Sequence, residues 1–129
     1  MPVERFSSGV PWESEVGYSR AVRAGPFVIL SGTTATTPDG VVLGGADLYV
    51  QTKSALAHLA TALERADARL EDVVQTRIYV TDIARWRDAG RAHAEVFHSI
   101  RPAATMVEVA ALIDPRLLVE IEALAYVGG

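Results

Sequence analysis

The chain has 129 residues, of which 50% are hydrophobic and 22% charged, and its 12 Lys and Arg against 16 Asp and Glu give a formal net charge of −4. This length and composition predict one folded domain over residues 1–129, the acidic balance argues against a nucleic-acid partner, and the lack of cysteine excludes disulfides, thiolate nucleophiles and cysteine-ligated metals. The N-terminal segment lacks the apolar region of a signal peptide and no apolar run is long enough to span a membrane, so we expect a small soluble cytoplasmic protein without membrane partners.

Two strands and a helix are predicted for the first half of the chain. The apolar run at residues 27–30 lies between turn residues, which is typical of a buried strand. The alternating segment 18–23 would precede it as the other arm of a hairpin across residues 24–26. From residue 46 to residue 66, apolar residues recur at three- and four-residue spacing, which predicts a helix with one apolar stripe.

A strand and a second helix follow. Residues 73–80 alternate between two faces, which puts Val74 on the same face as Ile78 and Val73 on the opposite face. Asp82 offers an N-cap for a helix that runs to about residue 97. The inward face of this helix is expected to carry Ile83, Trp86, Gly90, His93 and Phe97.

The order of the elements predicts an α+β domain. Two final strands are expected over residues 105–109 and 118–126, which gives a single mixed β-sheet of five to six strands. Two helices can cover only one face of such a sheet, so we expect both on the same face. The other face then requires a partner subunit, because a sheet buries its apolar surface against another layer.

Three glutamates fall within the two C-terminal strands. Glu120 and Glu122 share a face of the last strand, about 7 Å apart at ~3.3 Å per residue, and Glu108 belongs to the strand before it. Charges in apolar strands are costly unless paired, and crowded carboxylates raise one another's pKa values, which suits a general acid or base. On this chemistry alone a structural role is favoured, with the glutamates paired to Arg20 or Arg77 or lining a wet edge.

The histidines and the serine at the first strand end give weak signals. His93 lies on the apolar side of the second helix, where a histidine is commonly a satisfied core residue, although Gly90 leaves space beside it. His58 falls on the polar side of the first helix and is expected to face solvent. His93 and His98 point about 140° apart around a helix, so they cannot bind one metal together. We predict no metal and no cofactor, and Ser31 lacks the motif of a catalytic nucleophile.

Five short segments carry a family resemblance. They are Ser31-Gly32 at a strand end, Tyr79-Val80-Thr81-Asp82, Arg101-Pro102-Ala103, Val107-Glu108-Val109 and Val119-Glu120-Ile121-Glu122-Ala123. Together, over residues 16–127, they resemble the Rid/YjgF family of enamine/imine deaminases, also labelled L-PSP endoribonuclease-like. The resemblance implies a chorismate-mutase-like subunit in a homotrimer, with a small-molecule cleft at each subunit interface. It also implies that Glu120 lines the cleft, as the catalytic residue.

One departure from the family pattern bears on activity. Active deaminases of the family carry an arginine directly after Pro-Ala, which binds the carboxylate of a 2-imino acid, whereas Ala104 stands there in this chain. Such a contact contributes on the order of 1.5–3 kcal/mol, more than tenfold in binding. The cleft should therefore be roomier, more apolar and less positive. The substrate-binding residues carried over from the resemblance are Tyr18, Ser31, Gly32, Gly90, His93, Ala104, Thr105 and Met106.

Two functions stay open at this point. Arg101 is expected to point away from the cleft, whereas His93 could enter the space beside Gly90 and form a polar pair with Glu120. The protein is then either a metal-independent hydrolase of a small imine or enamine, with Glu120 positioning water, or a non-catalytic trimer that binds a small metabolite or another protein. Ribonuclease activity, sometimes attached to the family, finds no support in a chain of net charge −4 without a basic stripe.

Overall fold

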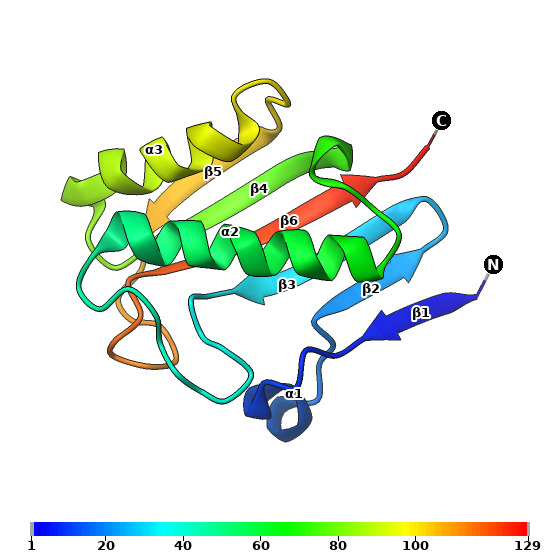
Figure 1. Ribbon diagram of the computed structural model, residues 1–129, viewed down its shortest axis with the longest axis horizontal. Coiled ribbons are helices and arrows are strands. Elements are labelled where there is room, and N and C mark those ends of the chain that lie inside the picture. Colours follow the sequence, from blue (N-terminus) through cyan, green and yellow to red (C-terminus); the bar gives the residue numbers. More distant parts are fainter. Residues whose placement is uncertain (1, 129) are drawn as a thin grey trace.

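The computed structural model describes residues 2–128 and consists of one sheet with two long helices on one face (Figure 1). The strands are β1 (Val3–Phe6), β2 (Ala21–Ala24), β3 (Phe27–Thr33), β4 (Val73–Val80), β5 (Ala103–Glu108) and β6 (Val119–Tyr126). The helices are α1 (Pro11–Val16), α2 (Leu48–Arg65) and α3 (Trp86–Phe97), with 3-10 turns η1 (Leu70–Asp72) and η2 (Ile83–Arg85). The strand order is β1-β2-β3-β6-β4-β5, and every neighbouring pair is antiparallel except β4 and β5. The predicted α+β class with a mixed sheet is confirmed.

The predicted elements lie close to their expected bounds. β4 coincides with the expected strand, and β2 and β3 form the expected hairpin. α2 begins at Leu48 because the side chain of Asp47 caps it, accepting a hydrogen bond from the backbone N–H of Val50 at 3.0 Å. β1 and α1 were not predicted from the sequence, because they are only four and six residues long and therefore too short for a clear periodic pattern.

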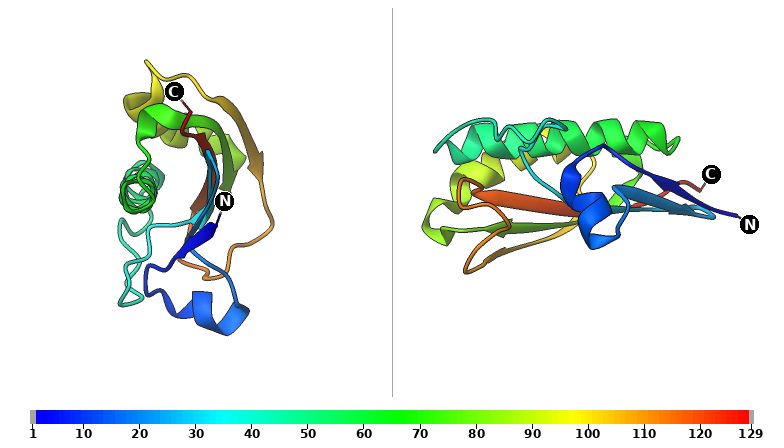
Figure 2. Two further views of the ribbon diagram at one scale, coloured as in Figure 1. Left: turned by 90° about the vertical axis from the view of Figure 1, so that its right-hand side faces the viewer. Right: turned by 90° about the horizontal axis from the view of Figure 1, so that it is seen from below.

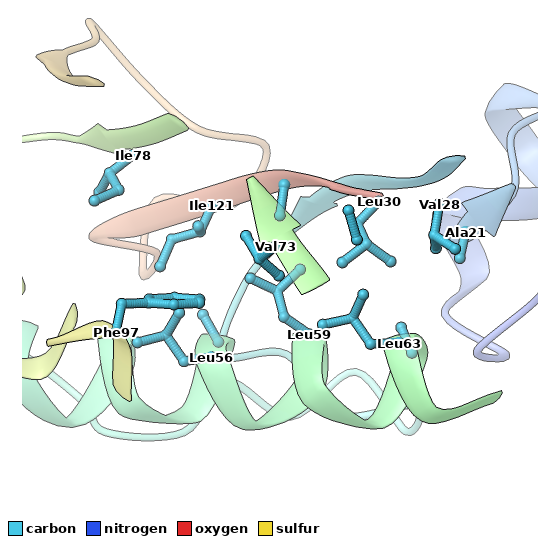
Figure 3. Close-up of a cluster of buried hydrophobic side chains, with 14 of the residues drawn as sticks. Ala21, Val28, Leu30, Leu56, Leu59, Leu63, Val73, Ile78, Phe97 and Ile121 are labelled. Carbon is cyan, nitrogen blue, oxygen red and sulfur yellow. The ribbon is translucent and has the colours of Figure 1, made fainter. Parts of the chain in front are cut away.

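The core lies between the sheet and the two long helices (Figure 3). Ile121 of β6 and Leu30 of β3 face the α2 side chains Leu56, Leu59 and Leu63, and all five are buried. These α2 residues are spaced by three or four, so they form one stripe on the helix, as its periodicity predicted.

The opposite face of the sheet carries no helix among the described residues, as the side views show (Figure 2). Exposed apolar side chains from three strands point to this open face, with Phe27 and Ile29 on β3, Tyr126 on β6 and Val107 on β5. Ile29 is 48% exposed although it lies in the middle of the sheet. The predicted uncovered face is therefore present. Within residues 2–128, no helix combines the length and apolarity needed to cross a bilayer.

The predicted face assignment was wrong at the start of β4. The pairing register with β6 shifts between Val73 and Gln75, and Val73 is buried while Val74 is exposed. A β-bulge adds one residue to one strand, so the alternation before it is out of phase with the alternation after it. Beyond the bulge, Thr76 and Ile78 face the core as expected.

The predicted inward face of the second helix was also partly wrong. Asp82 caps the turn η2, accepting a hydrogen bond from the backbone N–H of Ala84 at 3.1 Å, and the α-helix begins only at Trp86. A 3-10 turn has three residues per turn, so it shifts the phase of the residues that precede the α-helix. Ile83 is consequently exposed. Trp86, the first residue of α3, is exposed as well, whereas Phe97 is buried as predicted.

Candidate functional site

A cavity of about 800 Å³ opens between the sheet, α1 and α2. Its sheet side is formed by Tyr18, Ser31, Gly32 and Glu120, four of the residues predicted to bind or act on a ligand. Ser31 and Gly32 border it at a register shift between β3 and β6, which interrupts the regular pairing of those strands. The chain thus brings together residues from β3, β6 and the segment before β2.

A buried ion pair holds this side of the cavity in place. Arg20 Nε lies 3.2 Å from Glu13 Oε2, and both side chains are at least nine-tenths buried. The same guanidinium donates to the Gly32 carbonyl at 2.6 Å, to Thr33 Oγ1 at 2.9 Å and to the Tyr18 hydroxyl at 3.2 Å. Four of its five N–H donors are therefore engaged within the protein. Arg20 links α1 to the end of β3 and fixes Tyr18 beside the cavity.

Glu13 is stabilised as an anion by the chain that surrounds it. It accepts hydrogen bonds from Ser7 Oγ at 2.8 Å, from the Ser8 backbone N–H at 3.1 Å, and from the Ser8 hydroxyl. Burial raises the pKa of Glu13, but the hydrogen bonds from Ser8, Ser7 and Arg20 outweigh it and the pKa lies below its ordinary value. The carboxylate therefore remains ionised opposite Arg20.

Glu120 has a different environment. Its side chain is half-buried at the edge of the cavity and packs against Gly32, where an added Cβ would lie 2.7 Å from the Glu120 carboxyl carbon. Burial raises the pKa of Glu120; the charge of Arg20 lowers it in part and that of Glu122 raises it further. No hydrogen bond within residues 2–128 contributes to this pKa. A carboxyl group of this kind can exchange protons with a ligand or a water molecule.

The other two glutamates have structural partners. Glu122 accepts a hydrogen bond from the Tyr79 hydroxyl, and its Oε1 lies 3.8 Å from Arg77 Nη1. Glu108 accepts a hydrogen bond from the backbone N–H of Ile83 at 3.0 Å, at the start of η2. Of the three carboxylates that the sequence singles out, Glu120 alone borders the cavity without such a partner among the described residues.

The remaining predicted site residues lie outside this cavity. Gly90 and His93 belong to α3, and Ala104, Thr105 and Met106 belong to β5, the edge strand that β4 separates from β6.

His93 is bound within the helix layer of its own chain. Its Nε2 lies 2.9 Å from Thr76 Oγ1, its ring centroid is 4.6 Å from that of Phe97, and burial lowers its pKa. Thr76 points to the helix side of the sheet, whereas Glu120 pairs with Tyr79 and points to the other side. One chain therefore does not bring His93 and Glu120 together as a polar pair.

Arg101 is also engaged elsewhere. It has a left-handed backbone conformation, with φ of 58°, and its Nε donates to the His98 carbonyl at 2.8 Å. Among residues 2–128, no group of three His, Asp or Glu side chains is arranged to hold a metal ion.

Four residues of α2 border the cavity and were missed as site residues, and they are His58, Thr61, Ala62 and Arg65. His58 Nδ1 donates to the Thr34 carbonyl at 2.9 Å, so His58 is half-buried rather than facing solvent as expected. Arg65 donates to the Ser7 carbonyl. His58, Thr61 and Arg65 are spaced by three and four residues, so they share one side of α2. That spacing was visible in the sequence, but the segment that covers this side of the helix, residues 7–16, was not predicted.

The chain is similar to known proteins over nearly its whole length. A family model described as "Endoribonuclease L-PSP" matches residues 10–127. The crystal structure of Rv2704 from Mycobacterium tuberculosis, a member of the YjgF/YER057c/UK114 family, is 55% identical, covers 98% of this chain and 100% of its own, and has a TM-score of 0.89. SCO2049 of Streptomyces coelicolor is 41% identical over 126 residues, 98% of this chain and 93% of that protein. The RutC family protein PYRAB12510 of Pyrococcus abyssi is 33% identical over 109 residues, 84% and 85% of the two chains.

Proposed function

This chain belongs to the Rid/YjgF family, whose model is described as endoribonuclease L-PSP, and from that premise we propose that it hydrolyses an imine or enamine in the cavity beside Glu120. The observation that carries the proposal is the Glu120 carboxyl group. It is half-buried, its pKa is raised by that burial, and it borders a cavity of about 800 Å³ next to Gly32. General acid–base catalysts have pKa values moved toward the working pH, which fits this position.

The reaction needs one water molecule and one group that moves protons. Glu120, as the carboxylate, takes a proton from the water as the water oxygen bonds to the imine carbon, and it passes that proton to the imine nitrogen as the carbon–nitrogen double bond becomes single. The resulting amino alcohol breaks down when Glu120 takes the proton of its hydroxyl group and gives it to the nitrogen, so that the carbonyl group forms and ammonia leaves. The products are a carbonyl compound and ammonia, and Glu120 ends as a carboxylate. No oxidant and no metal is consumed.

The proposal includes a homotrimer with the cavity completed by a neighbouring copy. The site residues implied by the family resemblance fall into two groups in one chain, one around Glu120 and the other on α3 and β5. A neighbouring copy that places its edge strand β5 and its helix α3 beside the Glu120 side of this chain would bring the second group, which includes Gly90, Ala104 and Met106, to the first. The exposed apolar side chains of that open face, such as Ile29 and Val107, support an interface there.

Ala104 favours a second function, the binding of a small metabolite without its conversion. Because this residue has no cationic side chain, a 2-imino acid loses the contact that holds its carboxylate in the family's deaminases. A trimer that binds a small metabolite without converting it would not need an arginine to bind this carboxylate. The retained Glu120, Tyr18 and Gly32 support hydrolysis, since a site used only for binding has no need of a carboxyl group with a raised pKa.

The test is the hydrolysis rate of 2-imino acids generated in solution by an amino-acid oxidase. Alanine, leucine and phenylalanine give imines of increasing size, and a trapping amine reports how much imine survives. We expect the wild type to accelerate loss of at least one imine and Glu120→Gln to reduce the acceleration by about 100-fold or more. Ala104→Arg serves as the control for an intact cleft. Activity only in Ala104→Arg would favour the binding protein, and no activity in either protein would contradict hydrolysis of these imines.

A further inference from the structure

We propose that Arg65 binds an anionic group at the end of the cavity remote from Glu120, so that the ligand is an elongated imine or carbonyl compound with an apolar middle. The inference rests on the function proposed above and names the substrate class for the same cavity. It assigns Arg65 as a specificity-determining residue. The anion it binds is separated from the reacting carbon, unlike the carboxylate of a 2-imino acid.

The size and shape of the cavity carry the first step. A volume of about 800 Å³ is in the range that accommodates ligands far larger than a three-carbon imino acid. Its α2 wall runs from His58 to Arg65, seven residues or about 10 Å along a helix. Glu120 borders the cavity from the first residues of β6, whereas Arg65 is the last residue of α2. In Figure 1 α2 and β6 run in the same direction, so the start of β6 and the end of α2 lie toward opposite ends of the sheet.

The chemistry of the walls carries the second step. Beside hydroxyl-bearing side chains such as Thr34 and Thr36, the lining includes the apolar residues Val10, Trp12, Val16, Pro38, Ala62 and Ile113. These side chains supply an apolar surface, so the middle of the ligand is expected to be a hydrocarbon chain or a ring that packs against Trp12.

The placement of the cations carries the third step. Within the described part of the chain, the two arginines that line the cavity are Arg20 and Arg65. Arg20 already uses four of its five donors and faces Glu13, so it has little capacity left for a ligand. Arg65 donates to the Ser7 carbonyl and is otherwise exposed, which leaves most of its guanidinium free to bind an anion. Arg65 therefore supplies the positive charge that Ala104 lacks, at a different place.

The experiment measures binding of stable ketones by calorimetry, so its outcome does not depend on catalysis. The probes are 4-acetylbenzoate, whose carboxylate is remote from the carbonyl, 2-acetylbenzoate, whose carboxylate is adjacent to it, and the neutral methyl ester of the first. We expect wild type to bind 4-acetylbenzoate about three- to tenfold more tightly than its ester. The lower value corresponds to the contribution of an exposed ion pair, and the upper value to that of a charge-assisted hydrogen bond in a cleft. The remote acid should also bind more tightly than the adjacent one.

Two variants locate the contact. Arg65→Gln should abolish the preference for acid over ester, whereas Arg69→Gln, which removes an exposed arginine outside the cavity and makes the same change in net charge, should retain it. Thr61→Trp fills the exposed α2 wall between His58 and Arg65 and should weaken acid and ester alike.

Three results would overturn the assignment of Arg65. They are an acid preference that survives in Arg65→Gln, tighter binding of the adjacent acid than of the remote one, and no binding of any probe by wild type at millimolar concentration. An Arg65-dependent preference in a protein that hydrolyses no imine would instead refute the proposed function and leave this assignment standing. Hydrolysis of imines without that preference would do the reverse.

Discussion

Gly32 is a glycine because of Glu120. A Cβ on Gly32 would approach the carboxyl carbon of Glu120 to 2.7 Å and its Cγ to 3.0 Å, closer than such atoms can pack. Gly32 does not have the positive φ that explains six other glycines of the described chain, so backbone conformation is not what requires it. The sequence motif that placed both residues in one cleft therefore corresponds to a direct contact between them.

Gly32→Ala should separate the position of the Glu120 carboxyl group from the stability of the fold. The atoms that the new methyl group meets belong to the end of a flexible side chain, so Glu120 can move away and the free energy of unfolding should change by less than about 1 kcal/mol. Displacing a reacting group by about 1 Å costs on the order of 100-fold in rate, so imine hydrolysis should fall toward the level of Glu120→Gln. Urea unfolding and the oxidase-coupled rate check both parts. Full activity in a folded Gly32→Ala would show that this carboxyl position is not used.

Glu120→Gln should stabilise the protein at neutral pH. Burial, which is only partly offset by the charge of Arg20, raises the pKa of Glu120 in the folded state above its unfolded value. The folded state then binds the proton more tightly, so the wild type loses stability as the pH rises through the interval from the unfolded to the folded pKa. Glutamine carries no charge and avoids this loss. Thermal unfolding should give the variant a higher Tm at pH 7 and no advantage below about pH 4. A lower Tm at pH 7 would contradict the raised pKa.

Glu13 has the opposite effect on the pH dependence of stability, because it should make the protein less stable in acid. Its folded pKa is depressed, since hydrogen bonds from Ser8, Ser7 and Arg20 outweigh the effect of burial. Its contribution to stability is therefore complete above the unfolded pKa, near 4.5, and is lost as the pH falls through the folded value. Glu13→Ala leaves Arg20 buried without its partner and should destabilise the protein by about 3–5 kcal/mol at pH 7.

Urea unfolding at pH 7 and at pH 3 measures this effect, and the difference between Glu13→Ala and wild type should be smaller at pH 3. Glu15→Ala is the matched control, because Glu15 is an exposed glutamate of the same helix. An equal loss of stability in the two variants would contradict a structural role for the ion pair.

The parts of the fold that could be predicted from sequence are those set by long periodic patterns. The 18-residue helix α2 and the eight-residue strands β4 and β6 were predicted close to their bounds, because each repeats its apolar spacing over several turns or pleats. The errors concerned the face on which a side chain lies, and they occurred where local geometry interrupts the regular spacing of apolar residues. The bulge at Val74 and the 3-10 turn before Trp86 each change which face the neighbouring side chains point to. Neither can be recognised from the amino-acid composition of its segment.

The candidate site was predictable only in part, for a similar reason. Glu120 and Gly32 were singled out by short motifs, which need no knowledge of the folded chain. His58 and Arg65 border the same cavity as Glu120 only because residues 8–16 and α2 line it together, and contacts such as that of Arg65 with Ser7 join residues 58 positions apart. Pairings at that separation depend on the whole fold, so spacing along one element could not reveal them.

The open face of the sheet leads to a prediction about assembly. Ile29 is 48% exposed at the middle of that face, among the apolar side chains Phe27, Tyr126 and Val107. In the proposed trimer these side chains are covered by a second copy, and light scattering should give about 41 kDa, three times the chain mass of 13.8 kDa. Ile29→Glu should shift the mass toward 13.8 kDa, because it would put a charge into that interface without a partner.

Val50→Glu is the matched control for this experiment. Val50 is 40% exposed on α2, away from the open face, so a glutamate there changes the same charge and a comparable side chain without touching the proposed interface. This variant should retain the mass and the imine hydrolysis of the wild type. Ile29→Glu should lose both together, since the residues around Glu120 would no longer meet Gly90, Ala104 and Met106 of a neighbouring copy. A monomeric Ile29→Glu with full activity would show that one chain is sufficient for the reaction, and a wild type of 13.8 kDa would contradict the interface itself.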